Sequence, residues 1–162
     1  NDDVFDWMPR GRHSIERDVF PELAREGLLS GVPFEGYFID AGTPEAWNQA
    51  VKASIEHERY DSGFVQGPKP SWFAGQDHLA LVSPAARVEH SMVAEHCRIG
   101  RSTVAMSTLL KGAWVGDASR LNASLVGQGA RIGDGCQLDG VVVDHDAVVP
   151  DGTVLSGGTW PR

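Results

Sequence analysis

The sequence predicts a mainly β protein whose C-terminal half is a parallel β-helix, and three observations lead to this prediction. The first is an aliphatic residue that returns every five or six positions from residue 82 onward. The second is a small side chain that follows most of these residues four positions later. A spacing of six fits neither a 3.6-residue helix nor a hairpin meander, so it favours a hexapeptide-repeat β-helix. The aliphatic positions are Val82, Val88, Val93, Ile99, Val104, Leu109, Val115, Leu121, Val126, Ile132, Leu138, Val143, Val149 and Leu155, and the small ones are Ala86, Cys97, Thr103, Ala113, Ser119, Ala130, Cys136, Ala147 and Thr153, with Met92 as a bulky exception.

The third observation is a longer period of 17 residues, because the steps run five, six and six from Val104 onward. Three steps therefore make one triangular coil, and each side of the triangle stacks its own aliphatic residues. With strands ~4.8 Å apart, about four coils make a prism only ~20 Å tall, which holds side chains and nothing more. The predicted stacks are Leu109, Val126 and Val143; Val115, Ile132 and Val149; and Leu121, Leu138 and Leu155.

One side of the triangle ends in a repeated pair, in which an aliphatic residue is followed by glycine. The pairs are Ile99-Gly100, Val115-Gly116 and Ile132-Gly133, and Val149-Pro150 takes the next place. We interpret these pairs as corners, where glycine accommodates an unusual backbone dihedral angle.

Composition limits the function classes. The chain has 162 residues and a formal charge of -8, which fits one compact domain or slightly more. No run reaches the eighteen or so apolar residues of a membrane span, and the acidic balance argues against nucleic acid or an anionic bilayer as partner. We expect a soluble, cytoplasmic protein in which Cys97 and Cys136 are buried free thiols. Because the sequence begins at Asn1 without a methionine, we expect it to be a piece of a longer protein.

Residues 1–60 have the pattern of helices separated by a short strand. Ser14 is placed to cap a helix that continues to about Arg25 and ends at Gly27. Glu16 and Asp18 lie in its first turn, where the helix dipole stabilises carboxylates, and we expect their role to be local. After the predicted strand Tyr37-Phe38-Ile39, Thr43 and Pro44 begin a second helix that runs to about Arg59.

Two motifs in this region make a specific resemblance. Ser14-Ile15-Glu16-Arg17-Asp18-Val19-Phe20-Pro21, followed by Gly36-Tyr37-Phe38-Ile39-Asp40-Ala41-Gly42-Thr43-Pro44, resembles the end of a sugar-1-phosphate nucleotidyltransferase domain, as in mannose-1-phosphate guanylyltransferases. Such enzymes commonly continue into a left-handed β-helix, so the resemblance implies left-handed coils here. It also implies three parts: residues 1–60 close the α/β nucleotidyltransferase domain, residues 61–78 form a linker rich in Gly, Pro and Ser, and residues 79–162 form the β-helix.

The resemblance assigns one residue to chemistry. In that family the aspartate before the Gly-Thr turn is one of two carboxylates that bind the catalytic Mg²⁺, and Asp40 takes that position here, with Gly42 and Thr43 shaping its turn. The reaction joins a nucleoside triphosphate to a sugar 1-phosphate and releases pyrophosphate, and the cation neutralises charge. Without the resemblance, the sequence favours the interpretation of Asp40 as a turn residue that accepts backbone hydrogen bonds from the Gly42 loop, and the resemblance reverses that preference.

The family's glycine-rich nucleotide loop, its phosphate-binding Arg and Lys, and its first metal-binding Asp all precede the matched region. No glycine-rich loop followed by Arg or Lys opens a βαβ unit in residues 1–60. We therefore expect the missing N-terminal nucleotide-binding portion to be a partner of this one, and we expect this chain alone to be inactive.

Two alternatives stay open. The first is a hexapeptide acyltransferase, in which His90, His96 or His145 would be the general base, although the register places all three at outward corners. The second is a purely structural module that assembles a homo-oligomer, for which Trp114, and Trp72 and Phe73 before the coils, are candidate contact residues. Residues Gly157–Pro161 could cap the last coil or reach a neighbour.

The sequence does not predict a zinc site, because Cys97 and Cys136 lack the paired spacing of zinc ligands. The sugar, the nucleobase and any allosteric effector stay undetermined.

Overall fold

The computed structural model describes residues 2–57, 65–66, 72–74 and 81–161, and the chain divides into two compact units. The first unit is Asn1–Phe38 and the second is Ile39–Arg162. Most of the predicted linker at residues 61–78 lies outside the described residues.

The first unit is helical. It contains a 3₁₀ turn, η1 (Asp2–Trp7), and a π-helical turn, η2 (Ile15–Val19), that continues directly into α1 (Phe20–Arg25). Ser14 is the N-cap residue as predicted, but the cap is reversed: its backbone N–H donates to Oδ2 of Asp18 at 2.7 Å. Gly27 follows the helix with a φ of +69°, in the left-handed region that favours glycine. Asp18 therefore makes a local contact at the start of the helix, in agreement with the local role expected of it.

The predicted strand at Tyr37-Phe38-Ile39 is wrong. These residues have irregular structure, and no strand of the described chain pairs with them. A strand needs a hydrogen-bonded neighbour, so a sequence with strand preference does not form one by itself.

The second unit begins with a helix, α2 (Pro44–His57), that starts where the sequence predicts. The hydroxyl of Thr43 accepts a hydrogen bond from the N–H of Ala46 at 3.2 Å, which satisfies one of the free donors of the first turn. Arg59, where the helix was expected to end, lies outside the described residues.

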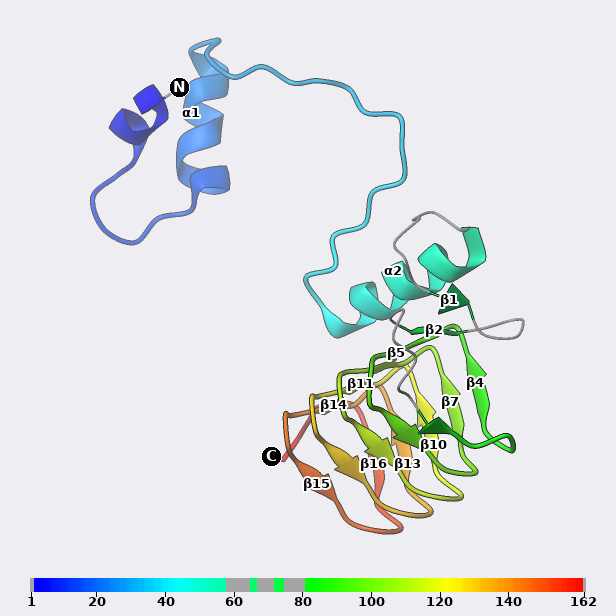
Figure 1. Cartoon of the computed structure of the whole chain (residues 1–162). Coiled ribbons are helices and arrows are strands. Elements are labelled where there is room, and N and C mark those ends of the chain that lie inside the picture. Colours follow the sequence, from blue (N-terminus) through cyan, green and yellow to red (C-terminus); the bar gives the residue numbers. More distant parts are fainter. Residues whose placement is uncertain (1, 58–64, 67–71, 75–80, 162) are drawn as a thin grey trace. The chain divides into compact units, whose positions relative to one another are not determined.

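The rest of the second unit is a parallel β-helix with three sheets around one core, and Figure 1 shows its coils stacked as a prism with α2 along one side. Sheet A contains β1 (Val65–Gln66), β2 (Trp72–Ala74), β5 (Ser91–Val93), β8 (Thr108–Leu109), β11 (Leu125–Val126), β14 (Val142–Val143) and β17 (Thr159–Trp160). Sheet B contains β3 (Leu81–Val82), β6 (Arg98–Ile99), β9 (Trp114–Val115), β12 (Arg131–Ile132) and β15 (Val148–Val149). Sheet C contains β4 (Arg87–Glu89), β7 (Thr103–Ala105), β10 (Arg120–Asn122), β13 (Gln137–Asp139) and β16 (Val154–Ser156).

The predicted aliphatic stacks are confirmed. Leu109, Val126 and Val143 pair across sheet A, Val115, Ile132 and Val149 across sheet B, and Leu121, Leu138 and Leu155 across sheet C. The solenoid has about five turns rather than four, because Val82 and Val88 already belong to sheets B and C. At the C-terminal end, Trp160 pairs with Val143 and packs against the core, so the chain end caps the last coil.

A ladder of buried polar side chains lies inside the coils. Met92 and Thr103 follow an aliphatic residue by four positions, as the small residues do elsewhere, but both are only half-buried, and Ser91 and Ser102 are the buried residues. The cause is the spacing of the aliphatic residues. Where two of them are five positions apart instead of six, the buried small residue lies three positions after the first one instead of four. The serines link successive coils, since the hydroxyl of Ser91 accepts from the N–H of Ser107 at 3.1 Å and that of Ser107 from Ser124 at 3.0 Å.

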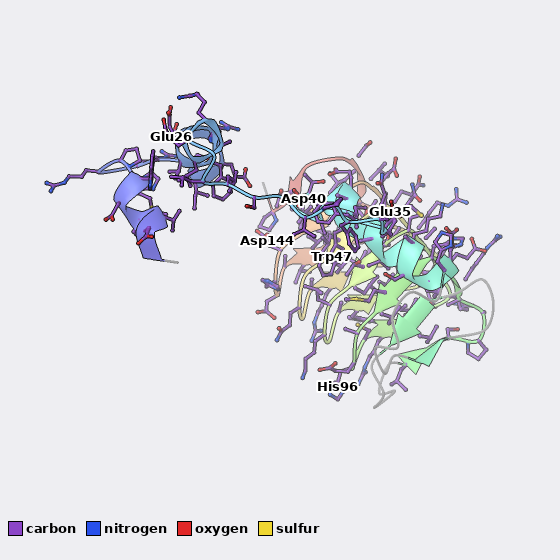
Figure 2. All side chains as sticks on the ribbon, turned by 90° about the horizontal axis from the view of Figure 1, so that it is seen from above. Glu26, Glu35, Asp40, Trp47, His96 and Asp144 are labelled. Carbon is purple, nitrogen blue, oxygen red and sulfur yellow. The ribbon has the colours of Figure 1, made fainter. Side chains whose placement is uncertain are left out.

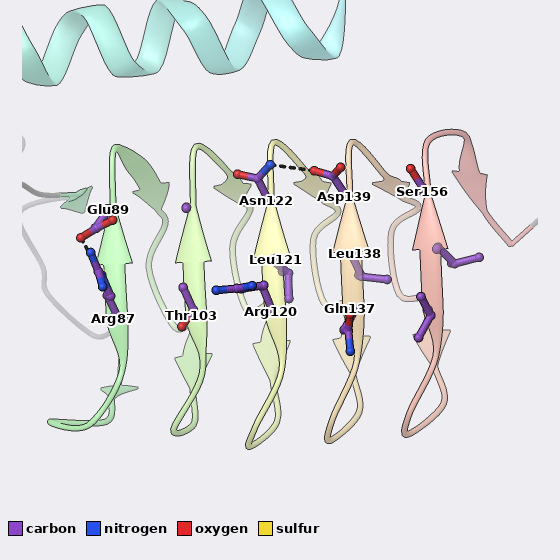
Figure 3. Close-up of a pocket in the computed structure, with 13 residues that line it drawn as sticks. Arg87, Glu89, Thr103, Arg120, Leu121, Asn122, Gln137, Leu138, Asp139 and Ser156 are labelled. Carbon is purple, nitrogen blue, oxygen red and sulfur yellow. Dashed lines mark hydrogen bonds and ion pairs between the residues drawn. The ribbon is translucent and has the colours of Figure 1, made fainter.

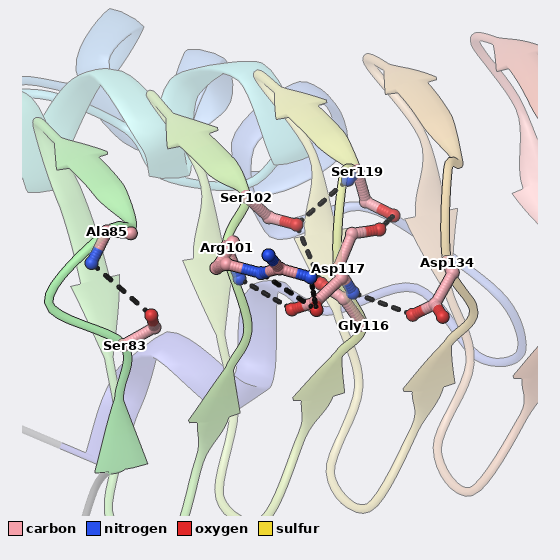
Figure 4. A network of polar contacts seen from close by, with 8 residues as sticks. All are labelled: Ser83, Ala85, Arg101, Ser102, Gly116, Asp117, Ser119 and Asp134. Atoms are coloured by element: carbon pink, nitrogen blue, oxygen red, sulfur yellow. Dashed lines mark hydrogen bonds and ion pairs between the residues drawn. The ribbon is translucent and has the colours of Figure 1, made fainter.

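An aspartate ladder lies at the corner between sheets B and C (Figure 4). Oδ1 of Asp117 accepts from the N–H of Arg101 at 2.8 Å, and Oδ1 of Asp134 accepts from the N–H of Asp117 at 2.6 Å. Asp151 accepts from Asp134 in the same way at 2.8 Å. The Arg101 guanidinium also binds Oδ2 of Asp117 at 2.7 Å, and this pairing holds the pKa of the Asp117 carboxyl below its usual value. Each carboxylate thus ties one coil to the coil before it.

Glycine is required at this corner for a reason that differs from the expected one. Gly100, Gly116 and Gly133 are not in the left-handed region, which at this corner is occupied by Ala118, Gly135 and Gly152. A Cβ on Gly100, Gly116 or Gly133 would collide with the aspartate carboxylate of the next coil. Glycine is therefore required here by the close approach of the aspartate ladder.

Candidate functional site

The candidate metal ligand, Asp40, lies in a short turn just before α2, as Figure 2 shows. Its Oδ1 accepts a hydrogen bond from the N–H of Gly42 at 3.1 Å, and the side chain is exposed. A Cβ on Gly42 would lie 3.2 Å from that oxygen, so glycine lets the carboxylate fold back over the turn. Thr43 then caps the helix. The turn is thus held by two adjacent hydrogen bonds, and the Asp40 side chain is exposed.

The helix that carries this turn is fixed to the β-helix by a polar contact. Nε1 of Trp47 donates to the hydroxyl of Thr108 on β8 at 3.0 Å, and that hydroxyl donates to Oδ1 of Asn48 at 3.0 Å. Asn48 is 2% exposed and Thr108 is fully buried, so these hydrogen bonds are shielded from water. Val51 and Ile55 continue the buried side of α2 along sheet A. The Asp40 turn is therefore attached to the outer face of sheet A.

One atom in this contact has no partner. The amide nitrogen of Asn48 is buried, and no hydrogen bond reaches it. A buried donor of this kind costs stability unless water satisfies it.

Near the end of α2, Oε1 of Glu56 lies close to two basic side chains. It is 3.7 Å from Nζ of Lys52 and 3.4 Å from Nε2 of His90.

The residues described here do not make a metal site by themselves. No group of three or more His, Cys, Asp or Glu side chains that could hold an ion occurs among the described residues. Asp40 offers a single carboxylate, whereas Mg²⁺ needs several oxygen ligands in octahedral geometry. An Mg²⁺ site at Asp40 would therefore require ligands from outside the described part of the chain.

The three candidate bases lie at corners, as expected, and are separated from each other. Nδ1 of His145 accepts a hydrogen bond from the N–H of Gln128 at 2.8 Å, so this nitrogen links two coils, as the aspartates do at the other corner. His90 faces Glu56 of α2, and His96 is exposed with a φ of +61°. Figure 2 shows His96 far from Asp40 and Trp47. No two of these histidines share a site in the described structure.

Both cysteines are buried and free, as predicted. Burial raises the pKa of the Cys97 thiol to about 11, so at neutral pH this side chain is a protonated, unreactive core residue. Sγ of Cys136 lies 3.1 Å from the carbonyl oxygen of Pro150 and continues the inner polar ladder of its corner.

A groove lies on the outer face of sheet C (Figure 3). It has a volume of about 620 Å³ and is lined by outward side chains of all five strands. Sequence analysis did not find it, because an alternation of inward and outward residues is the same in a solvated face and in a binding face. The Thr108 contact was also missed, because it joins residues 61 and 60 positions apart.

The β-helix and part of the sequence before it are similar to known proteins. Residues 81–158 match the family model "GlmU-like, C-terminal hexapeptide". Among curated proteins, the chain is similar to glucose-1-phosphate adenylyltransferases. That of Desulfitobacterium hafniense is 28% identical over 121 residues, which covers 73% of this chain and 30% of the relative. That of Geobacillus stearothermophilus is 31% identical over 114 residues, which covers 67% of this chain and 28% of the relative. The chain thus spans under a third of the length of these relatives.

The solved structures to which the chain is similar include acetyltransferases. The acetyltransferase domain of PglB from Neisseria gonorrhoeae has a TM-score of 0.41 at 20% identity, and the match covers 73% of this chain and 71% of that one. A mutant of GDP-perosamine N-acetyl transferase from Caulobacter crescentus has a TM-score of 0.27 at 26% identity, with 51% and 48% covered.

No helix in the described residues is long and apolar enough to cross a membrane. The fold, the matched family model and the relatives agree on a coarse description. Residues 81–158 form a β-helix that matches the GlmU-like hexapeptide family model, and the chain is similar to part of the sequence of glucose-1-phosphate adenylyltransferases.

Proposed function

We propose that this chain is the C-terminal portion of a sugar-1-phosphate nucleotidyltransferase, which forms a nucleoside diphosphate sugar and pyrophosphate. The observation that carries the proposal is the extent of the similarity. The 73% of the chain matched by the adenylyltransferases is about 118 residues, and only 82 residues lie between residue 81 and the C-terminus. The similarity therefore includes residues that precede the hexapeptide repeats, which a relationship through the β-helix alone would not require.

In this proposal, Asp40 contributes one carboxylate to Mg²⁺ in the intact enzyme, and the other ligands come from the nucleotide-binding portion. The bound cation would neutralise charge on the triphosphate. This chain's own contribution is to hold the carboxylate in place: Gly42 fixes one oxygen, Thr43 caps α2, and Trp47 and Asn48 fasten α2 to Thr108. The sugar phosphate and the nucleoside triphosphate would bind mainly to the nucleotide-binding portion.

The β-helix would serve assembly or regulation. Its interior is filled by side chains, so its outer faces are the surfaces available to a second copy or to an effector. Because α2 joins the Asp40 turn to sheet A, a change at the β-helix can reach that turn through one rigid element. A homo-oligomer is part of this proposal.

The test is pyrophosphate release by a protein that contains this chain together with a nucleotide-binding portion, compared with the chain alone. Two substrate pairs separate the specificities: ATP with glucose 1-phosphate, as for the relatives, and GTP with mannose 1-phosphate, as in the guanylyltransferases that the motifs resemble. We expect turnover with one pair by the longer protein and none by the chain alone.

Asp40→Asn should lower kcat about 100-fold or more in the longer protein, because a metal ligand is lost. Asp144→Asn is the matched control, since Asp144 is also an exposed carboxylate but lies outside the Asp40 turn. Equal activity of Asp40→Asn and Asp144→Asn would remove Asp40 from the site. Acetyl transfer from acetyl-CoA by a longer protein with no nucleotidyltransferase activity would replace this proposal with the acyltransferase alternative.

A further inference from the structure

The groove on sheet C runs between two rows of outward side chains, as Figure 3 shows. The rows lie two residues apart along each strand, which is ~6.6 Å, and neighbours in a row are ~4.8 Å apart. Most of the side chains in both rows are polar. The first row is Arg87, Thr103, Arg120, Gln137 and Val154, and the second row is Glu89, Ala105, Asn122, Asp139 and Ser156.

The groove contains a recess over β7. There it is bordered by two small side chains, Thr103 and Ala105, whereas both neighbouring coils carry longer ones. On β4, Arg87 and Glu89 are ion-paired at 2.7 Å and so join the two rows. On β10, the guanidinium of Arg120 points toward Thr103 (Figure 3). We call this space the β7 recess; it lies between coils that are ~9.6 Å apart and has a cation at one edge.

The cation at this edge has no counter-ion among the described residues. Arg120 is exposed, and none of the ion pairs found in the described parts of the chain involves it. A guanidinium presents its donors as a planar fork that matches a carboxylate. The hydroxyl of Thr103, which occupies the paired position on the next strand, can donate to the same group. A carboxylate in the β7 recess would therefore meet a charged donor and a neutral donor side by side.

The other lining residues indicate what the carboxylate is attached to. Sites for apolar ligands are lined mainly by hydrophobic and aromatic side chains, but none of the described residues that line this groove is aromatic. Asn122 donates to Asp139 at 2.7 Å, and Gln137 adds a second carboxamide. Hydroxyl groups both donate and accept, so they can satisfy carboxamides and carboxylates alike. The carboxylates of Glu89 and Asp139 oppose a group with two negative charges, such as a phosphate ester.

We propose that the β7 recess binds a sugar acid, which is a monosaccharide with one carboxylate and several hydroxyl groups. The carboxylate lies between Arg120 and Thr103, and the hydroxyl groups extend along the groove toward Asn122. The groove volume of about 620 Å³ is within the ~300–1,000 Å³ range of small-molecule sites. This inference does not depend on the proposed function, because none of these residues belongs to the Asp40 turn or to α2.

The experiment is a titration of the 162-residue chain with D-glucuronate, followed by saturation-transfer difference NMR at pH 7 in low salt. This method observes the ligand, so it works in any assembly state of the chain. Glucose is the matched ligand without a carboxylate, and glucose 6-phosphate carries a phosphate in its place. Because the groove is open to solvent, we expect a dissociation constant on the order of 1 mM for glucuronate. Glucose should bind at least tenfold more weakly, and glucose 6-phosphate should also bind more weakly than glucuronate.

Three substitutions test the residues of the recess. Arg120→Gln removes the charge and should weaken glucuronate binding about tenfold or more, with loss of the preference over glucose. Thr103→Val keeps the shape of the side chain without its hydroxyl and should weaken binding about threefold. Ala105→Phe fills the recess without removing a charge and should abolish binding. Arg98→Gln on sheet B is the matched control and should change the dissociation constant less than twofold, and circular dichroism checks that each variant is folded.

Four results would overturn the proposal. The first is the absence of any saturation transfer to glucuronate at 20 mM, and the second is equal binding of glucose and glucuronate. The third is tighter binding of glucose 6-phosphate, which would mean that the recess recognises a phosphate rather than a carboxylate. The fourth is glucuronate binding that Arg120→Gln and Ala105→Phe leave unchanged, which would place the bound sugar acid elsewhere on the protein.

Discussion

The interior and the corners of the β-helix contribute to the fold in different ways. Inside, the stack of sheet A contains Val93, Leu109, Val126 and Val143, so any of these aliphatic residues could follow another. A coil displaced along such a stack would bury nearly the same apolar area. At the corner between sheets B and C, each aspartate accepts from a backbone N–H of the preceding coil. Those hydrogen bonds are directional links between successive coils. The interior therefore supplies apolar burial, and the corners supply specific polar contacts from coil to coil.

The corner also explains why one coil can be shorter. Leu121 and Leu138 are 17 residues apart, whereas Val88 and Val104 are 16 apart, and the step from Ile99 to Val104 is the short one. There the N–H of Ser102 donates to the carbonyl of Gly100 at 2.8 Å, which makes a tighter turn. The guanidinium of Arg101 also donates two hydrogen bonds to Oδ2 of Asp117. The ladder thus continues across the shortened corner.

The largest effect should come from the interior. Leu121→Ala removes a fully buried side chain from the middle of sheet C and should lower the free energy of unfolding by about 3 kcal/mol, through lost burial and the cavity that is left. Urea unfolding followed by circular dichroism measures it. Leu81→Ala is the control, because Leu81 is 63% exposed, and it should change stability by less than about 0.5 kcal/mol. Equal losses would mean that the stacks do not form the core.

The next effect should come from the corner itself. Gly116→Ala places a methyl group against the carboxylate of Asp134 and the backbone of Gly133, and should cost about 2 kcal/mol through overpacking. Gly31→Ala is the control, since nothing lies within 4 Å of a Cβ there. The cost of Gly116→Ala should fall in part when Asp134 is also replaced by alanine. An unchanged cost in that background would show that the carboxylate is not what requires glycine.

Sequence reasoning succeeded where structure repeats and stopped where contacts are long-range. The aliphatic stacks follow from spacing alone, because each residue's partner is one coil away. The inward places of Ser91 and Ser102 were missed, since the five-residue step shifts the inward position by one. The contact between Trp47 and Thr108 has no periodic signal, because a helix and a strand far apart in sequence meet only in the folded protein.

The region before α2 shows the opposite limit. Thr43 and Pro44 locate the start of the helix correctly, because capping is a local interaction. The strand expected at Tyr37-Phe38-Ile39 is absent from the described structure, because a strand depends on a neighbour that local sequence cannot supply. Asp40 has the turn geometry expected of it, but its role as a metal ligand is a prediction that rests on resemblance.

A smaller effect tests the outer face of sheet A. Thr108→Val keeps the shape of the side chain but leaves Nε1 of Trp47 and Oδ1 of Asn48 without their partner, which should cost about 1.5 kcal/mol. Amide hydrogen exchange in α2 should speed up about tenfold, since the helix undocks more often. Thr159→Val is the matched control, because Thr159 is exposed on the outer face of the same sheet. If both variants leave exchange in α2 unchanged, the polar contact does not hold the helix.

The smallest effect should come from the exposed side of the corner, and it should depend on pH. The Arg101 guanidinium and backbone N–H hold the pKa of Asp117 below its ordinary value of 3.8, so the folded state prefers the carboxylate. A lowered pKa gives stability that is fully present above the unfolded value and is lost as pH falls through the folded value. Asp117→Asn should therefore lower Tm at pH 7 by less than Thr108→Val, and the difference from the unsubstituted chain should shrink below about pH 4. Added salt should weaken the Arg101 part of the effect, because the pair is exposed. Asp144→Asn is the control for the loss of one negative charge. If the Tm difference for Asp117→Asn stays constant from pH 7 to pH 3, the carboxylate of the ladder acts through its shape rather than its charge.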